Sequence, residues 1–115
     1  MLVKINKNDF EVKVLIESSE TSEGMMNKVF DDFDGMLFVM GSGNHSFWMM
    51  NCIIPLDIIF IDDKLKITKI HHYCEPCESQ PCERYRGNGT FVLEIDGGIC
   101  EELGIKEGQT CEFYK

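Results

Sequence analysis

Short apolar runs separated by turn-forming residues are the feature that most restricts the fold of this chain. Residues 55–62, PLDIIFID, form the clearest run, because β-branched side chains dominate it and a DDK turn closes it. Residues 64–70, KLKITKI, alternate polar and apolar side chains, which predicts a strand with one face in water. Similar short runs predict further strands at 2–5, 10–17, 35–40, 47–50, 90–95 and 109–115.

Two segments predict short helices. Residues 19–30, SETSEGMMNKVF, place hydroxyl side chains ahead of apolar residues at helical spacing. Residues 97–104, GGICEELG, predict a second helix that ends at Gly104. About eight short strands and two short helices predict a mainly β (α+β) fold for residues 1–115 as a single domain. The expected architecture is a small curled or closed antiparallel β-barrel whose interior is filled by side chains.

The acidic charge of the chain restricts its partners. The net charge is −9, from 11 basic and 20 acidic residues, so phosphate backbones repel the protein. The few basic residues are scattered, and we therefore expect no nucleic-acid partner. The sequence contains no apolar run long enough to span a membrane, and its start, MLVKINKNDF, does not resemble a signal peptide. These features predict a cytoplasmic protein whose partner is a small molecule or another protein.

A loop rich in cysteine and histidine, HHYCEPCESQPCERY, occupies residues 71–85. The spacing of Cys74 and Cys77 is that of half a zinc site, with Cys82 as a third ligand and His72 as a fourth. The same cysteines are also compatible with a disulfide or with free thiols. A reducing compartment disfavours the disulfide, and the sequence leaves all three states open.

The segment FWMMNCIIPLD, residues 47–57, predicts a ligand pocket. Trp48 would form a wall, and Asn51 and Asp57 would supply polar contacts, with Glu94 opposite. An unpaired carboxylate inside an apolar strand is costly, so Asp57 is expected to have a polar partner. The alternative is that Asp57 and Glu94 accept backbone N–H groups and hold loops in place. Two further ligand contacts are expected, a counter-ion at Lys28 and an aromatic side chain at Tyr85.

Several other residues are most simply explained by packing or solvation. Six of the seven methionines lie within residues 25–50, where a flexible thioether suits a core better than a copper site. His45 lies in GSGNHS, residues 41–46, which predicts a hairpin-type loop with a solvated histidine. Isolated cysteines are predicted to be small buried hydrophobes, namely Cys52, Cys100 and Cys111.

Five motifs in order give the chain a family resemblance: EGMMNK, GMLFVM, FWMMNCIIPLDIIFID, FVLEIDGG and LGIKEG. Together they resemble the domain-of-unknown-function 192 family over residues 17–111. The resemblance implies a small β-barrel-like α+β domain and assigns no reaction. The chain departs from the family pattern at Met50, where a basic residue is usual, and at Cys52, where threonine is usual. Lys28 replaces an arginine of the pattern.

The same resemblance bears on the cysteine loop. Some members of the family carry cysteines at the positions of Cys77 and Cys82, in a loop that ends at Tyr85. That arrangement suits a bridge or a metal, and it leaves Cys74 as an additional thiol.

Two functions follow from these patterns. The first is a non-catalytic module that binds a ligand or a protein. The second is a small zinc-dependent enzyme, or a zinc-stabilised domain, that uses residues 71–85. The sequence contains no nucleophile elbow, phosphate-binding loop or dinucleotide fingerprint, which favours the first.

Overall fold

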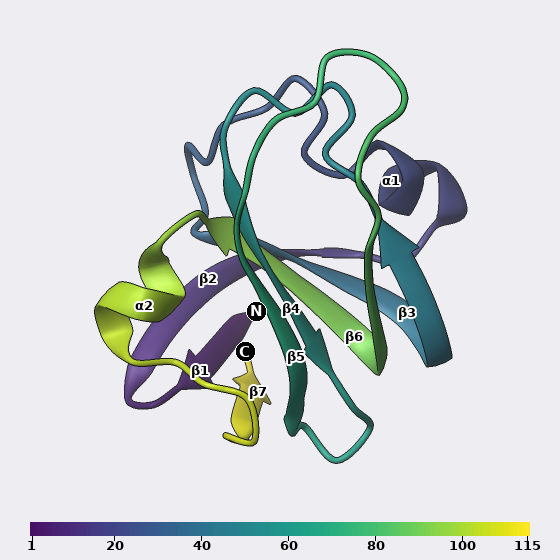
Figure 1. The fold of residues 1–115 in the computed structure, drawn as a ribbon. Helices are drawn as coiled ribbons and strands as arrows, with labels where there is room; N and C mark the ends of the chain where they lie inside the picture. The colour runs from purple at the N-terminus through teal and green to yellow at the C-terminus, as the bar shows by residue number, and fades with distance from the viewer.

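A computed structural model describes residues 1–115 and places seven strands in one curled, half-barrel sheet. The strand order is β5-β4-β6-β3-β2-β1-β7, and two short helices accompany the sheet (Figure 1). This confirms a mainly β fold, with one strand fewer than the approximate number predicted. The elements are β1 Leu2–Ile5, β2 Asn8–Leu15, α1 Ser18–Glu23, β3 Gly35–Phe47, β4 Leu56–Ile61, β5 Ile67–Cys74, β6 Tyr85–Asp96, α2 Ile99–Leu103 and β7 Cys111–Tyr114.

The two outer strands of the sheet, β5 and β7, meet at one point. Lys66 and Thr110 form an isolated bridge. The N–H of Ile67 donates to the carbonyl of Gln109 at 2.8 Å, beside that bridge. The sheet therefore curls far enough for its edges to touch, as the expectation of a curled or closed barrel required.

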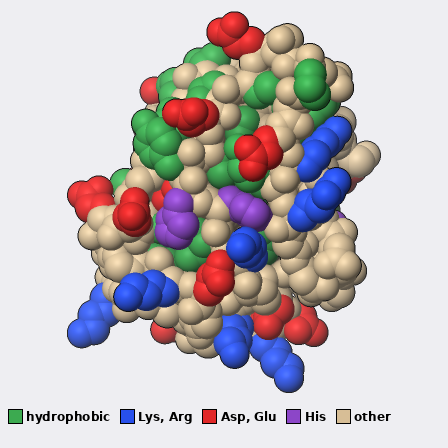
Figure 2. Space-filling model, in the orientation of Figure 1, with side chains coloured by type: hydrophobic (Ala, Val, Ile, Leu, Met, Phe, Trp, Pro, Cys, Tyr) green, Lys and Arg blue, Asp and Glu red, His purple; other side chains and the backbone are tan.

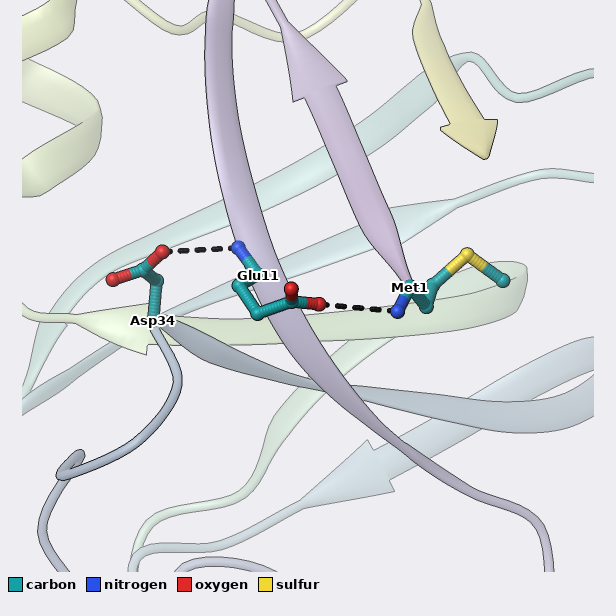
Figure 3. Close-up of polar contacts among 3 residues, drawn as sticks. All are labelled: Met1, Glu11 and Asp34. Atoms are coloured by element: carbon teal, nitrogen blue, oxygen red, sulfur yellow. Dashed lines mark hydrogen bonds and ion pairs between the residues drawn. The ribbon is translucent and has the colours of Figure 1, made fainter. Parts of the chain in front are cut away.

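One pair of strands is parallel, whereas the sequence predicted an antiparallel sheet throughout. β2 and β3 run in the same direction, with Val12 opposite Gly35, and every other pairing is antiparallel. A parallel pair needs a crossover of a dozen or more residues, and residues 16–34 provide one that includes α1. Figure 3 shows a polar clamp where this pair begins: the N–H of Glu11 donates to Asp34 at 2.9 Å, and the Glu11 carboxylate pairs with the N-terminal ammonium at 3.0 Å.

Three local expectations were wrong: residues 47–50 do not form a strand of their own, since β3 continues to Phe47, and glycine conformation explains the other two. The first helix ends at Glu23 instead of continuing to residue 30, because Gly24 adopts a φ of 48°. Residues 41–46 belong to β3 instead of forming a hairpin loop: a register shift takes up residues 40–42 as a bulge, and Gly43 to Ser46 then pair with β6. His45 therefore lies in a strand, half-buried, with its Nε2 2.6 Å from the carbonyl oxygen of Gly41. The end of α2 at Gly104, in the left-handed conformation, is as predicted.

The core consists of two apolar clusters on opposite faces of the sheet. Strand β4 shows the division, because Ile59 and Ile61 belong to the first cluster while Ile58 and Phe60 belong to the second. The second cluster also holds the predicted core methionines Met25, Met36 and Met49. The isolated cysteines are buried as predicted, Cys100 and Cys111 in the first cluster and Cys52 in the second.

The irregular segments 24–34, 48–55 and 75–84 gather at one end of the molecule beside α1, at the top of Figure 1. α2 lies on another side of the sheet and covers the first cluster. Acidic and basic side chains are interspersed on the face shown in Figure 2. Neither helix has the length and apolar character needed to cross a bilayer.

Candidate ligand pocket

Asp57 is fully buried and holds the start of α2 in place. Its Oδ1 accepts the N–H of Tyr73 at 2.8 Å and that of Gly98 at 3.1 Å, and its Oδ2 accepts the N–H of Cys100 at 2.8 Å. Three charge-assisted bonds to backbone donors satisfy a buried carboxylate. Asp57 therefore has the structural role that the sequence offered as the alternative to a ligand contact.

Glu94 is the other buried carboxyl, and its surroundings are different. It lies on β6 opposite Met36 of β3 and Ile58 of β4, on the face of the second cluster. Only 4% of the residue is exposed. Neither carboxyl oxygen has a hydrogen bond within the protein, but the side chain is not sealed off, since no fully buried side-chain oxygen lacks a partner. Burial alone raises the pKa of Glu94 to about 8. At neutral pH the acid is mostly protonated and lacks a partner.

A cavity of about 200 Å³ opens over Glu94. Seven of its 14 lining residues are apolar, three of these aromatic, and α1 with the residue after it forms one side. Trp48 and Arg84 lie on the outer side, where the guanidinium is 4.3 Å from the centre of the indole ring. Arg84 makes no ion pair with any carboxylate. The lining residues are Thr21, Ser22, Glu23, Gly24, Met25, Met26, Phe38, Met40, Ser46, Phe47, Trp48, Cys52, Arg84 and Glu94.

The other ionisable groups that line the cavity are held in their ordinary charge states. Burial, followed by the charge of Glu94, raises the pKa of the Cys52 thiol to about 11, so this sulfur is a thiol at neutral pH. A hydrogen bond from Lys28 lowers the pKa of Glu23, which is therefore a carboxylate. The cavity thus combines a neutral acid on its floor with one carboxylate and one guanidinium nearer the surface.

The structure brings together two of the six predicted ligand contacts. Trp48 and Glu94 line the same cavity. Asp57 is used by α2, and Lys28 pairs with Glu23 at a neighbouring shallow depression.

The two remaining predicted contacts also lie outside the cavity. Asn51 lines a separate depression with Asn27. Tyr85 packs at the edge of the second cluster, with its ring 5.4 Å from that of His71. Arg84 and the phenylalanines of β3 were not predicted as contacts, because no local pattern distinguishes them from solvated or core residues.

The predicted metal set does not come together. Cys77 and Cys82 form a disulfide with each other, which removes both thiolates from that set. Cys74 is buried at the end of β5, where burial raises the pKa of its thiol to about 12, and His72 is exposed on the same strand. No group of three or more histidine, cysteine or acidic side chains is placed to hold a metal ion.

The disulfide loop supports the wall of the cavity instead. The N–H of Cys77 donates to the carbonyl of Met49 at 3.1 Å, and the N–H of Asn51 donates to the carbonyl of Cys77 at 3.0 Å. Cys82 Sγ lies 3.5 Å from the sulfur of Met50. These contacts hold the segment that follows Trp48 against residues 77–82.

Comparison with known proteins gives relatives of the same fold. A protein of unknown function from Novosphingobium aromaticivorans matches with a TM-score of 0.87 and 30% identity, over 97% of this chain and 84% of that one. A putative transcription regulator from Sinorhizobium meliloti matches with a TM-score of 0.81 and 29% identity, over 91% of this chain and 82% of that one. A comparison with curated proteins gave no match. The family model of DUF192, described as uncharacterized ACR, matches residues 1–113, and the chain therefore belongs to the DUF192 family.

Proposed function

We propose that this protein is a non-catalytic binding module that takes a small, mostly apolar organic ligand into the cavity over Glu94. The carboxyl of Glu94 is the observation that carries the proposal: it is almost buried, it has no hydrogen bond within the protein, and it lines the cavity. No fully buried side-chain oxygen lacks a partner, so the carboxyl is reached from the cavity. A ligand in the cavity can therefore bond to it.

The size and lining of the cavity support a small ligand. Pockets typically combine apolar walls with polar groups that fix orientation, and here half of the lining is apolar and Glu94 is the most buried polar group. The volume of about 200 Å³ is below the range of drug-sized sites, and a cavity of about 150 Å³ accepts benzene. The ligand that fits is thus a single ring or a chain of similar bulk.

Binding is better supported than catalysis because the lining offers no activated nucleophile. The Cys52 sulfur is a thiol at neutral pH, since its pKa is raised to about 11. The Ser46 hydroxyl has no hydrogen bond to a base, and no histidine lines the cavity. Glu94 alone has a pKa close to neutral pH. A single acid is insufficient for most hydrolytic mechanisms.

The sole tryptophan reports directly on occupancy, because Trp48 lines the cavity. Three compounds of the same shape serve as probes: cyclohexylamine, cyclohexanol and cyclohexanecarboxylate. We expect at least one to change Trp48 emission in a saturable way and to shift the amide resonances of cavity residues.

A blocking variant and a matched control complete the test. Ser46→Leu adds bulk at the cavity lining, whereas Ser42→Leu adds the same bulk elsewhere on β3. Binding should be lost in Ser46→Leu and kept in Ser42→Leu. The proposal fails if none of the three probes binds, or if Ser46→Leu binds as well as the unmodified protein.

A further inference from the structure

The geometry points to an organic cation as the ligand: a primary ammonium group on a compact apolar body, with the ammonium placed on the carboxylate of Glu94. This inference rests on the proposed function and assigns the chemical class of the ligand. It follows from three features of the cavity, namely the floor, the walls and the charges around the entrance.

Glu94, on the floor of the cavity, determines which polar group of a ligand fits there. No side chain of the protein donates a hydrogen bond to Glu94, whose carboxyl is accessible from the cavity. An ionised carboxylate is an acceptor only, and an ammonium group has three donors and no acceptor. A buried carboxylate is tolerated when an opposite charge pairs with it and donates hydrogen bonds. The group missing from the floor is therefore a positively charged donor.

The walls suit the same charge. Trp48, Phe38 and Phe47 present aromatic rings to the cavity, and aromatic faces attract cations. Phe38 and Phe47 meet edge to face, with ring centres 5.1 Å apart, so their orientation is fixed by packing. The guanidinium of Arg84 already lies over Trp48, which shows that this wall accepts a cation.

The charges around the entrance leave a small balance in favour of cations, which comes from the net charge of −9 on the chain. Glu23 contributes a carboxylate to the lining, but it is exposed and paired with Lys28. Arg84 opposes a cationic ligand, but it is exposed and solvent screens its charge. Removal of the Arg84 charge should therefore tighten the binding of an ammonium ligand and weaken that of a carboxylate.

Binding of a cation is coupled to the loss of a proton. The empty pocket holds Glu94 mostly protonated at pH 7, since its pKa is about 8. An ammonium ligand binds the ionised form and so displaces that proton. The ionised fraction grows about tenfold between pH 7 and pH 9, and the affinity should rise by the same factor.

Other groups near Glu94 do not reverse this dependence. Cys52 and Cys74 are thiols over this range, because their pKa values are raised to about 11 and about 12. Glu23 on α1 stays ionised, because the hydrogen bond from Lys28 lowers its pKa. β3 and β4 present only apolar side chains opposite Glu94.

Calorimetric titration with cyclohexylamine at pH 7, 8 and 9 tests the inference. This amine remains protonated over the range, because the pKa of an alkyl ammonium is near that of lysine. We expect the affinity to rise about tenfold from pH 7 to pH 9. At pH 7, buffers of different ionisation enthalpy should reveal the release of nearly one proton per ligand bound.

Variants test whether the Glu94 carboxylate is responsible for the binding of the amine and for its pH dependence. Glu94→Gln should weaken the binding of cyclohexylamine at pH 9 at least tenfold and remove the pH dependence, whereas the exposed variant Glu112→Gln should change neither. Arg84→Gln should strengthen binding several-fold. Proton release is measured on the unmodified protein, so the test stands even where Glu94→Gln fails to fold.

The outcomes distinguish this inference from the proposed function. If cyclohexanol or cyclohexanecarboxylate binds more tightly than cyclohexylamine, or if amine affinity falls as the pH rises, the pocket binds a ligand but the assignment of a cation is wrong. If none of the three compounds binds, both proposals fail.

Discussion

Replacing Glu94 by glutamine should change how the stability of the protein depends on pH. The folded-state pKa of about 8 lies above the ordinary value of 4.5, so between these values the folded protein keeps a proton that the unfolded chain has lost. The free energy of unfolding of the unmodified protein should therefore fall as the pH rises from about 4.5 to about 8. Glutamine does not titrate, so Glu94→Gln should lack this loss.

The magnitude follows from the same interval. From 4.5 to about 8, at about 1.4 kcal/mol per pH unit, the loss amounts to roughly 5 kcal/mol. This is large against a total stability of about 5–15 kcal/mol for a domain. A buried amide without a partner has a cost that is independent of pH. The free energy of unfolding of Glu94→Gln should therefore rise steadily relative to that of the unmodified protein as the pH increases.

Urea unfolding at half-unit steps from pH 4.5 to pH 9, followed by circular dichroism, measures this difference. Glu112→Gln, an exposed glutamate on β7, serves as the control and should track the unmodified protein at every pH. The reasoning is refuted if the difference between Glu94→Gln and the unmodified protein changes by less than about 1 kcal/mol from pH 5 to pH 8.

Three further predictions concern the supports of the cavity and the sheet. Asp57→Asn should cost about 2–4 kcal/mol, since an NH2 group replaces one carboxylate oxygen and leaves at least one of the three backbone donors without an acceptor. Urea unfolding and amide exchange at the start of α2 measure this cost. Reduction of the Cys77–Cys82 disulfide should cost about 2 kcal/mol, the value expected for so short a closed loop, and thiol titration in denaturant should rise from four groups to six on reduction. Gly87→Ala should cost about 1–3 kcal/mol, because a Cβ there would lie 2.5 Å from the ring of Phe60.

Each of these predictions has a control and a contradicting result. Asp63→Asn, in an exposed turn, should be nearly neutral, and an equally mild Asp57→Asn would refute the role assigned to Asp57. Six reactive thiols in denaturant without reductant would contradict the disulfide. Thermal melting of Gly87→Ala is compared with that of Gly104→Ala, where no atom lies within 4 Å of the added Cβ and only the positive φ of 70° opposes the substitution.

The sequence predicted well those elements whose signal is local. The β-branched run of β4 and the glycine that ends α2 lie where their patterns placed them. The parallel pairing of β2 and β3 was missed, because its direction depends on the path of residues 16–34. The sequence of neither strand shows that direction.

The candidate site also combines residues that the sequence could predict with residues whose positions depend on distant contacts. Trp48 and Glu94, two of the predicted ligand contacts, line the same cavity. Asp57 was expected beside them, but the register pairs Glu94 with Ile58 of β4 and so puts Asp57 on the other face of the sheet. A shift of one residue would reverse this, and register between distant strands is set by the whole core.

The cysteine loop was the hardest part to predict from sequence. Spacing alone allows Cys74, Cys77 and Cys82 to hold a metal, to form a bridge or to remain free. The direction of each sulfur decides between these states. Cys74 packs in the second core cluster at the end of β5, while Cys77 and Cys82 face each other across a short loop.

The most direct test of this account is the titration of the Glu94 carboxyl itself, by its ¹³C resonance, with and without saturating cyclohexylamine. The account predicts a pKa of about 8 for the free protein, and a clear decrease when the amine is bound. A pKa near 4.5 in the free protein would show that Glu94 is already solvated or paired and would contradict the account.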